Sequence, residues 1–478
     1  MKFYWYVSGL TIAGLLVLNG CSSLPSVGPD YVEPELEIPD AWHEAVQDEF
    51  KSGEPDLQTW WTVFNDPTLN MLIERASTNN LDLKTAVARI EQSASLLGVS
   101  ASQWWPELSA GGSASTYKIT QANTYGGAID REGELYDVGI SMAWELDLWG
   151  RIRRSVESAD ASLQASVENY RDILVVLYSD IALNYINVRT LQERIHYAEN
   201  NLEAQNETLT LTKNRFDSGL VPALDVSQSQ LNHSRTQSVI PPLKLELVEA
   251  INRLSVLMGE MPYALYKELE EIKPIPTVSG DLIVGVPADL LRQRPDIRRA
   301  ERELASQHAL IGATKAELYP TLSLPGSLAV QTSGSDLFTG DNLYYSFAPQ
   351  LRWNLFNGKR IRSQVNAEEA GTKAALYTYE QALLLALEEV EYQMAAYANE
   401  TDRAGFLDVA AASAERSVEL VTELYTSGLT DFQNVLNMEQ ALLDQQDQLA
   451  LSKGLISAHL VGVYKALGGG WDMSAEEE

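Results

Sequence analysis

The sequence predicts a mainly α-helical protein built from two tandem repeats, each with two β-strands and a pair of long helices. The first observation is a set of matching residues that recur at one constant offset of 214 positions (296 − 82): Asp82, Leu83, Ala86, Gly98, Pro106, Leu108 and Ser109 match Asp296, Ile297, Ala300, Gly312, Pro320, Leu322 and Ser323. The second is a seven-residue spacing of apolar side chains in two later segments: Val226, Ile240, Leu247 and Leu254, then Val435, Leu442, Leu449, Ile456 and Val463. A long repeat fixes the architecture, and a sustained heptad spacing packs helices as a coiled coil.

Each repeat begins with a helix that ends at a proline and is followed by a strand. In the second repeat, Pro295 suits the first turn of this helix, and Pro320 stops it because proline lacks the N–H that a continuing helix needs. Apolar and polar residues then alternate with the period of a strand. The first repeat shows the same pattern, with a helix expected from Asn80 to Trp105 and a shorter helix before it, from Asp66 to Thr78.

A second strand is expected in each repeat, separated from the first by polar, glycine-containing loops at Ile119 to Leu135 and Thr332 to Asn342. Its apolar residues share one parity: Val138, Ile140, Met142, Trp144, Leu146 and Leu148 in the first repeat, and Tyr345, Phe347, Leu351, Trp353 and Leu355 in the second. This alternation fits a sheet packed on a soluble core. It fits a membrane barrel with a wet lumen equally well, because the opposite face carries Asp, Glu and Arg.

Long helices follow each pair of strands, from about Gly150 to Phe216 and from about Lys359 to Tyr425. At 1.5 Å per residue each would be roughly 100 Å long. A coiled coil or a tube wall needs such a length, whereas a globular core does not. Both helices end at a matching turn, where Gly219 and Gly428 suit the left-handed conformation that terminates a helix.

The composition argues against several functions. The formal net charge is −31, from 35 basic and 66 acidic residues, so nucleic acid and anionic lipid headgroups are not expected partners. Solubility or a saline habitat explains this charge more simply than a cation-binding role. The single cysteine excludes an internal disulfide, and the five histidines show no metal-ligand spacing. Without a Ser/His/Asp or glycine-rich phosphate motif, we expect no cofactor and no enzymatic activity.

The N-terminus has the form of a bacterial lipoprotein signal. Residues 1–20 contain a short apolar core, from Val7 to Leu18, which is too short to span a bilayer. Leu18-Asn19-Gly20-Cys21 resembles a lipobox, so Cys21 is the expected lipidation site, and Ser22 after it favours the outer membrane. The alternative is an ordinary secretory signal followed by an unrelated thiol. Residues 21–59 then read as an extended segment that tethers the protein to the lipid.

Motifs in a fixed order extend over nearly all the chain after Cys21. They comprise Trp60-Trp61, Phe64, Asp66-Pro67 and Leu69, and later Leu290-Leu291, Arg294-Pro295-Asp296-Ile297, Ala300-Glu301, Ile311-Gly312, Ala316 and Tyr319-Pro320. In these motifs the chain resembles the TolC/OprM-like outer membrane factor family, and in particular its lipoprotein, NodT-like branch. The resemblance implies efflux repeats at residues 60–261 and 287–470, a linker at 262–286 and an acidic tail at 471–478.

The resemblance favours the barrel interpretation of the strands. One chain offers only four strands, while known barrels start at about eight, and an open sheet edge in lipid leaves backbone groups unpaired. The chain must therefore oligomerise if it spans a membrane. The family implies a homotrimer, with a twelve-stranded transmembrane β-barrel in the outer-membrane lipid and an α-helical tunnel through the periplasm.

The implied function is that of a passive outer-membrane duct in a tripartite efflux system. Small molecules, such as drugs, toxic compounds or metal ions, are delivered by an inner-membrane pump of the RND type through a periplasmic adaptor (membrane fusion protein). One alternative is an outer-membrane duct for type I protein secretion. Another is a periplasmic coiled-coil structural lipoprotein or pump adaptor, and a third is a soluble periplasmic enzyme.

The resemblance also implies a gate where the two helix turns narrow the periplasmic end of the tunnel. In the family, an acid after the first turn bonds to a tyrosine and an arginine at the second. The matching residues are Asp225 and Tyr425, while Thr430 stands at the arginine position. Two acids of the family's constriction fall on Asn434 and Asn437. The closed state is therefore expected to rest on neutral hydrogen bonds.

A plainer interpretation exists for the same residues, in which Asp225 caps the return helix and Tyr425 packs at the turn. The turns themselves are the expected contacts for the adaptor, through Ser218, Gly219, Leu220, Ser427, Gly428 and Leu429.

Overall fold

The computed structural model describes residues 26–35, 38–39, 42–43, 50–52, 57–118, 132–278, 282–284, 293–333 and 342–472. The expected signal peptide, Cys21, most of the two strand-connecting loops and the end of the acidic tail lie outside these described residues. The chain divides into two compact units. The first comprises Met1–Glu35, Ile90–Ser166 and Ala300–Tyr379, and the second Leu36–Arg89, Val167–Arg299 and Glu380–Glu478.

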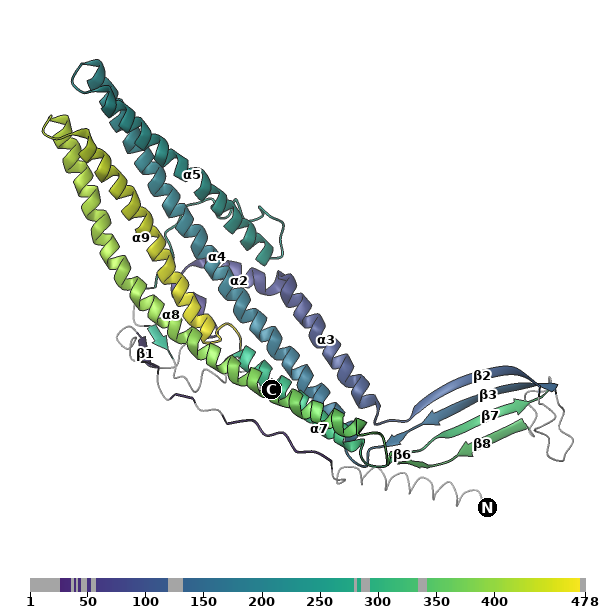
Figure 1. Ribbon diagram of the computed structural model, residues 1–478. Helices are drawn as coiled ribbons and strands as arrows, with labels where there is room; N and C mark the ends of the chain where they lie inside the picture. The colour runs from purple at the N-terminus through teal and green to yellow at the C-terminus, as the bar shows by residue number, and fades with distance from the viewer. Residues whose placement is uncertain are drawn as a thin grey trace. The chain divides into compact units, whose positions relative to one another are not determined.

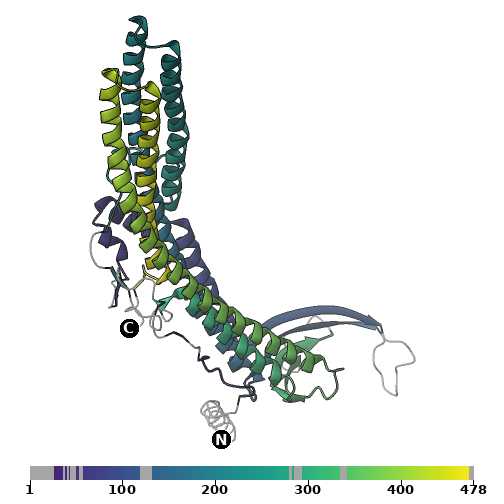
Figure 2. The same cartoon turned by 60° about the vertical axis from the view of Figure 1, so that its left-hand side comes forward.

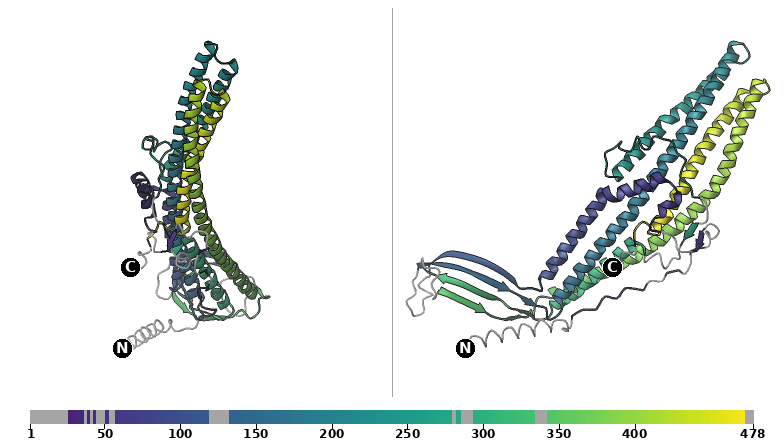
Figure 3. Two further views of the ribbon diagram at one scale, coloured as in Figure 1. Left: turned by 90° about the vertical axis from the view of Figure 1, so that its left-hand side faces the viewer. Right: turned by 180° about the vertical axis from the view of Figure 1, so that it is seen from behind.

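The first unit contains a four-stranded antiparallel sheet in the order β2-β3-β7-β8, visible in Figure 3. Its strands are β2 (Glu107–Lys118), β3 (Glu132–Ala143), β7 (Gly326–Thr332) and β8 (Leu343–Phe347). Because β3 pairs with β7, strands of the two repeats are neighbours, with Ile140 opposite Leu328. Both of these apolar side chains are more than half exposed, as is Phe347. Within the described residues no core covers this face, which favours the barrel interpretation over a sheet packed on a soluble core.

Three strands that the alternation predicts as continuous are each divided in two. The short partners are β4 (Glu145–Leu146), β6 (Thr321–Ser323) and β9 (Gln350–Arg352), which form a separate sheet in the order β4-β6-β9. Pro325 lies between β6 and β7, and Pro349 lies between β8 and β9. Proline has no N–H to donate to a neighbouring strand, so the ladder is interrupted at these positions.

The predicted helices are confirmed, with lengths that match between the repeats. The repeats begin with α3 (Leu81–Ser102) and α7 (Pro295–Ala316), each of 22 residues. Helices α4 (Arg151–Asp217) and α8 (Arg360–Thr426) have 67 residues each, and α5 (Ala223–Leu257) and α9 (Phe432–Ala466) have 35 each. Figures 1 and 2 show α4 with α5 and α8 with α9 as two adjacent hairpins. No helix in the described ranges is apolar over a length that would cross a bilayer.

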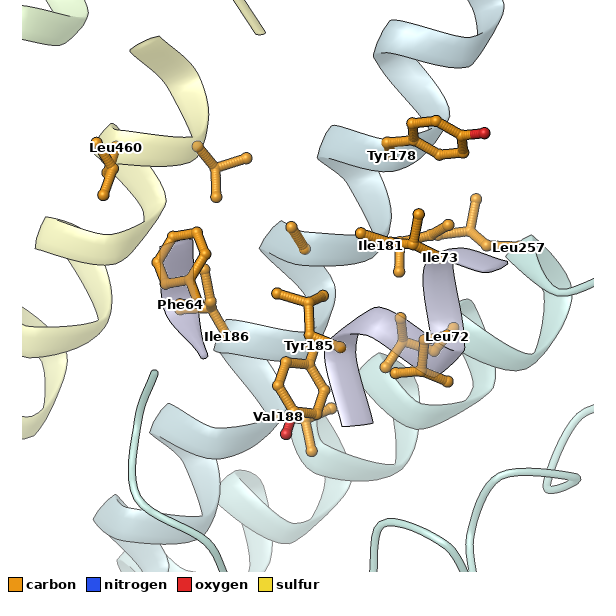
Figure 4. Packing of buried hydrophobic residues seen from close by; sticks show 14 of the residues in the cluster. Phe64, Leu72, Ile73, Tyr178, Ile181, Tyr185, Ile186, Val188, Leu257 and Leu460 are labelled. Atoms are coloured by element: carbon orange, nitrogen blue, oxygen red, sulfur yellow. The ribbon is translucent and has the colours of Figure 1, made fainter. Parts of the chain in front are cut away.

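The main hydrophobic core lies in the second unit, where the hairpins meet a short N-terminal layer (Figure 4). This layer consists of a 3-10 helix, η3 (Trp60–Phe64), and α2 (Pro67–Asn79). Trp60 is fully buried and stacks on Tyr464 of α9, with ring centroids 5.4 Å apart. Asp66 caps α2 by accepting from Thr68 N at 2.8 Å, and it also accepts from the Tyr185 hydroxyl of α4 at 2.6 Å. A two-stranded parallel pair, β1 (Phe50–Ser52) with β5 (Leu282–Val284), completes the unit.

Candidate functional site

The two turns between the long helices have the same backbone geometry. We call residues 218–220 the first tip and residues 427–429 the second tip. At the first tip, Gly219 N donates to Phe216 O at 2.8 Å and Leu220 N donates to Arg215 O at 2.9 Å. At the second, Gly428 N donates to Tyr425 O at 3.0 Å and Leu429 N donates to Leu424 O at 2.9 Å. These paired bonds are the Schellman motif, which satisfies the last carbonyls of a helix.

Glycine is required at one position of each tip. Gly219 has φ 72° and Gly428 has φ 74°, a left-handed conformation that costs L-residues free energy because their Cβ approaches the carbonyl oxygen. All six residues of the two tips are exposed, and Leu220 and Leu429 have 67% and 74% of their surface accessible. Each tip therefore presents one leucine to solvent from a rigid turn.

Two of the four residues predicted for the gate are brought together. The Tyr425 hydroxyl donates to Asp225 Oδ2 at 3.4 Å, a long hydrogen bond that joins the end of α8 to the start of α5. Tyr425 is only 3% exposed and packs edge-on against Phe432, with ring centroids 5.3 Å apart. Val221, from beside the first tip, packs against the same apolar cluster. The plainer interpretation of Tyr425 as a packing residue is thus compatible with its hydrogen bond.

Asp225 does not act as the cap of α5. The N-cap residue is Pro222, which has no side-chain cap, and Asp225 lies in the first helical turn. A carboxylate there is favourable because it faces the positive end of the helix dipole. Burial raises the pKa of Asp225, and the hydrogen bond from Tyr425 lowers it. Burial likewise raises the pKa of Tyr425, so its hydroxyl stays protonated and able to donate.

The other two predicted residues, Asn434 and Asn437, are exposed on α9 and do not join this contact. Asn434 Nδ2 donates to Thr430 Oγ1 at 2.8 Å, and Asn437 Oδ1 accepts from Gln433 Nε2 at 3.0 Å. These are local bonds along the start of one helix. Both amides are therefore available at the surface of the single chain.

Sequence reasoning missed Arg215, which brings a positive charge to the second tip. Its Nη1 donates to the carbonyl oxygen of Thr426 at 2.7 Å, and its guanidinium carbon lies 5.0 Å from the centre of the Tyr425 ring. The expectation that only neutral hydrogen bonds act here is therefore wrong. The cation comes from α4 instead of position 430. The available signal was a basic residue in the last turn of α4, where it also faces the negative helix end.

Away from the tips, a buried carboxyl group joins three helices. Glu439 of α9 is 6% exposed and accepts from Thr208 Oγ1 of α4 and from Asn232 Nδ2 of α5, each at 2.8 Å. No ion pair within the described part of the chain includes Glu439. Burial raises its pKa, because desolvation disfavours the charged form more than the two hydrogen bonds favour it.

Helical hairpins built from repeats and a sheet with an exposed apolar face are the features expected of a membrane channel subunit. Residues 72–260 and 286–469 match the model of the family described as outer membrane efflux protein. The chain belongs to this family, and the resemblance drawn from its motifs is confirmed. The protein is therefore an outer-membrane efflux protein that extends into the periplasm. Its family consists of channel proteins.

Known relatives and solved structures agree with this assignment. Nodulation protein T of Rhizobium leguminosarum bv. trifolii is 30% identical over 439 residues, which cover 91% of each chain. The pyoverdine export outer membrane protein OpmQ of Pseudomonas aeruginosa is 30% identical over 469 residues and 96% of each chain. The solved outer-membrane channel OprN is 33% identical with a TM-score of 0.87, covering 93% of this chain and 99% of its own.

Proposed function

We propose that this chain is the passive outer-membrane duct of a tripartite efflux system and that it works as a homotrimer. The observation that carries the proposal is the open edge of its sheet. Within the described strands, β2 pairs only with β3, and β8 pairs only with β7. Unpaired strand edges in lipid cost several kcal/mol per backbone group. Three copies would supply twelve strands and would pair β2 of one copy with β8 of the next.

Substrate delivery requires partners, and the two exposed tips are the surface that we assign to them. A periplasmic adaptor would contact Leu220 and Leu429, and an inner-membrane pump of the RND type would supply the energy. The substrate class that we propose is small molecules, including toxic compounds or metal ions. Support comes from the names of relatives, which include a toluene efflux pump outer membrane protein, TtgI, and a cation efflux system protein, CusC.

The N-terminal part of the proposal is a lipid anchor at Cys21 after removal of residues 1–20. Residues 26–35 support it, because polar contacts fix them to two helices of the first unit. Arg154 of α4 binds Asp30 and Ser26, and the Tyr31 hydroxyl donates to Glu301 of α7 at 2.6 Å. A segment fixed in this way would hold the acyl chains close to the unit that contains the sheet. The divisions that we propose for the mature chain are residues 21–59, 60–261, 262–286, 287–470 and 471–478.

Deletion of the protein tests the function. The deleted strain should become more sensitive to toxic small molecules or metal ions, and expression of the wild-type chain should restore resistance. Unchanged sensitivity across a broad panel would reject efflux. Independently, mass measurement in detergent should give three copies of the chain. A folded, monodisperse monomer would reject the duct, and undiminished fatty-acid labelling of Cys21→Ser would reject the anchor.

A further inference from the structure

Arg215 reaches from one hairpin to the end of the other. It lies in the last turn of α4, is half-buried, and its Nη1 donates to Thr426 O at 2.7 Å. Thr426 is the last residue of α8. The final carbonyl groups of a helix have no partner within it and carry partial negative charge. Arg215 therefore caps the C-terminus of α8 from a different hairpin, 211 residues earlier in the sequence.

The same guanidinium covers one face of the Tyr425 ring, while Asp225 lies at the hydroxyl group. The distance from the Arg215 guanidinium carbon to the ring centre is 5.0 Å, within the range of a cation–π contact. The Asp225 carboxylate accepts from the hydroxyl at 3.4 Å. Tyr425 of α8 is thus held on two sides by residues of the first hairpin, one on α4 and one on α5.

These contacts lie at the last turn of the helices, where an apolar cluster also joins the two hairpins. Two further polar contacts join them at this level: Thr212 of α4 hydrogen-bonds to Tyr425, and the exposed Gln228 Nε2 donates to Gln433 Oε1 at 3.1 Å. Opening of the tips would separate the Arg215 guanidinium from the Thr426 carbonyl and from the Tyr425 ring at once. A charged donor loses more than a neutral one when its partner is removed.

We propose that Arg215 is a positioning residue that latches the second tip to the first and so holds the duct closed. Arg215, which comes from α4, supplies the positive charge that Thr430 cannot supply. This inference rests on the proposed duct and on closure at its tips. The inference adds Arg215 to the residues that hold the tips closed. Among these residues, Arg215 makes the strongest single contact.

The test is single-channel recording of the full-length protein in planar bilayers. Arg215→Ala should raise the open-to-closed ratio about tenfold, which corresponds to about 1.4 kcal/mol. Arg215→Lys keeps the charge but loses the planar group that stacks on the ring, so it should give an intermediate ratio. Lys213→Ala is the matched control, because it removes an equal charge from an exposed side chain two residues away and should leave the ratio unchanged.

The outcomes separate this inference from the proposed closure. If Asp225→Ala with Tyr425→Phe opens the channel while Arg215→Ala behaves as wild type, closure at the tips stands and the latch is wrong. If none of these variants opens it, both are wrong. If Lys213→Ala opens the channel as much as Arg215→Ala does, loss of a positive charge alone explains the effect. That result would also reject the role proposed for Arg215. Arg215→Gln serves in place of Arg215→Ala if the latter fails to assemble.

Discussion

The two tips share one backbone and differ in their side chains. Each has a Schellman turn with glycine at φ 72° or 74°. At positions 209 residues apart, however, Arg215 corresponds to Leu424 (424 − 215), and Asp225 corresponds to Asn434 (434 − 225). Arg215 and Asp225, which flank the first tip, are thus replaced by neutral residues beside the second, where a buried tyrosine, Tyr425, stands in the place of Phe216. The contacts that join the two hairpins here therefore use side chains that the repeats do not share.

The return helices α5 and α9 also differ at matching positions. Glu439 of α9 is 6% exposed, while its counterpart in α5 is Gln230 (439 − 230 = 209), an exposed residue that donates to Ser234 Oγ at 3.2 Å. One repeat thus buries an ionisable group where the other places a neutral amide in solvent. Because burial raises the pKa of Glu439, we expect this position of the second repeat to stabilise the fold less at neutral pH than in acid.

The largest expected effect comes from giving the second repeat the residue of the first. Glu439→Gln removes a buried charge that has no cationic partner among the described residues and whose pKa burial raises, so it should stabilise the protein at neutral pH by about 1–3 kcal/mol. The measurement is the thermal unfolding midpoint of the detergent-solubilised protein, followed by circular dichroism. Gln205→Glu would be the reverse change at another buried amide and should destabilise.

The pH dependence of the stability shows whether ionisation of Glu439 causes this effect. Because the folded-state pKa of Glu439 is raised above its ordinary value of 4.5, its contribution is most favourable below that pH and is lost as pH rises through the folded-state pKa. The two proteins should therefore be equally stable in acid and diverge toward neutral pH. A constant difference at every pH would mean that packing, not ionisation, separates them.

A smaller and equal effect is expected at the two glycines. Gly219→Ala and Gly428→Ala should each destabilise by about 1–2 kcal/mol, because each forces an L-residue into the left-handed conformation. A Cβ at either position would meet no atom within 4 Å, so strain of the backbone is the only cause. Thermal unfolding of the two variants under identical conditions checks this. Clearly unequal destabilisation would show that the tips do not share one turn geometry.

The sequence was sufficient for features that local chemistry determines. The ends of α4 and α8 follow from Gly219 and Gly428, and the start of α7 follows from Pro295. The breaks at Pro325 and Pro349 were not predicted, because the alternation of apolar and polar residues continues across both prolines. The contacts at the helix turns were harder to predict from the sequence. Asp225 and Tyr425 were found by resemblance, but the contact of Arg215 with Thr426 joins residues 211 positions apart and has no periodic signal.

The smallest effect should come from adding acidic residues at the start of α9. Asp at both Asn434 and Asn437 would place two carboxylates on an exposed turn of α9. Screened surface charges act weakly, so block of single-channel current by multivalent cations should strengthen only about twofold to fivefold, on the order of 1 kcal/mol. Asn206→Asp, on an exposed face of α4, is the control. If it strengthens block equally, the amides do not line the constriction.

We propose that contact between the two hairpins beside their tips closes the duct, and a double-mutant cycle in single-channel recordings tests this most directly. Asp225→Ala and Tyr425→Phe each remove the same hydrogen bond, which is worth about 0.5–1.5 kcal/mol. Each should raise the open-to-closed ratio several-fold, and the double variant should open no more than the stronger single one, because coupled residues are not additive. Effects that multiply independently, or no change in any variant, would contradict closure by this contact.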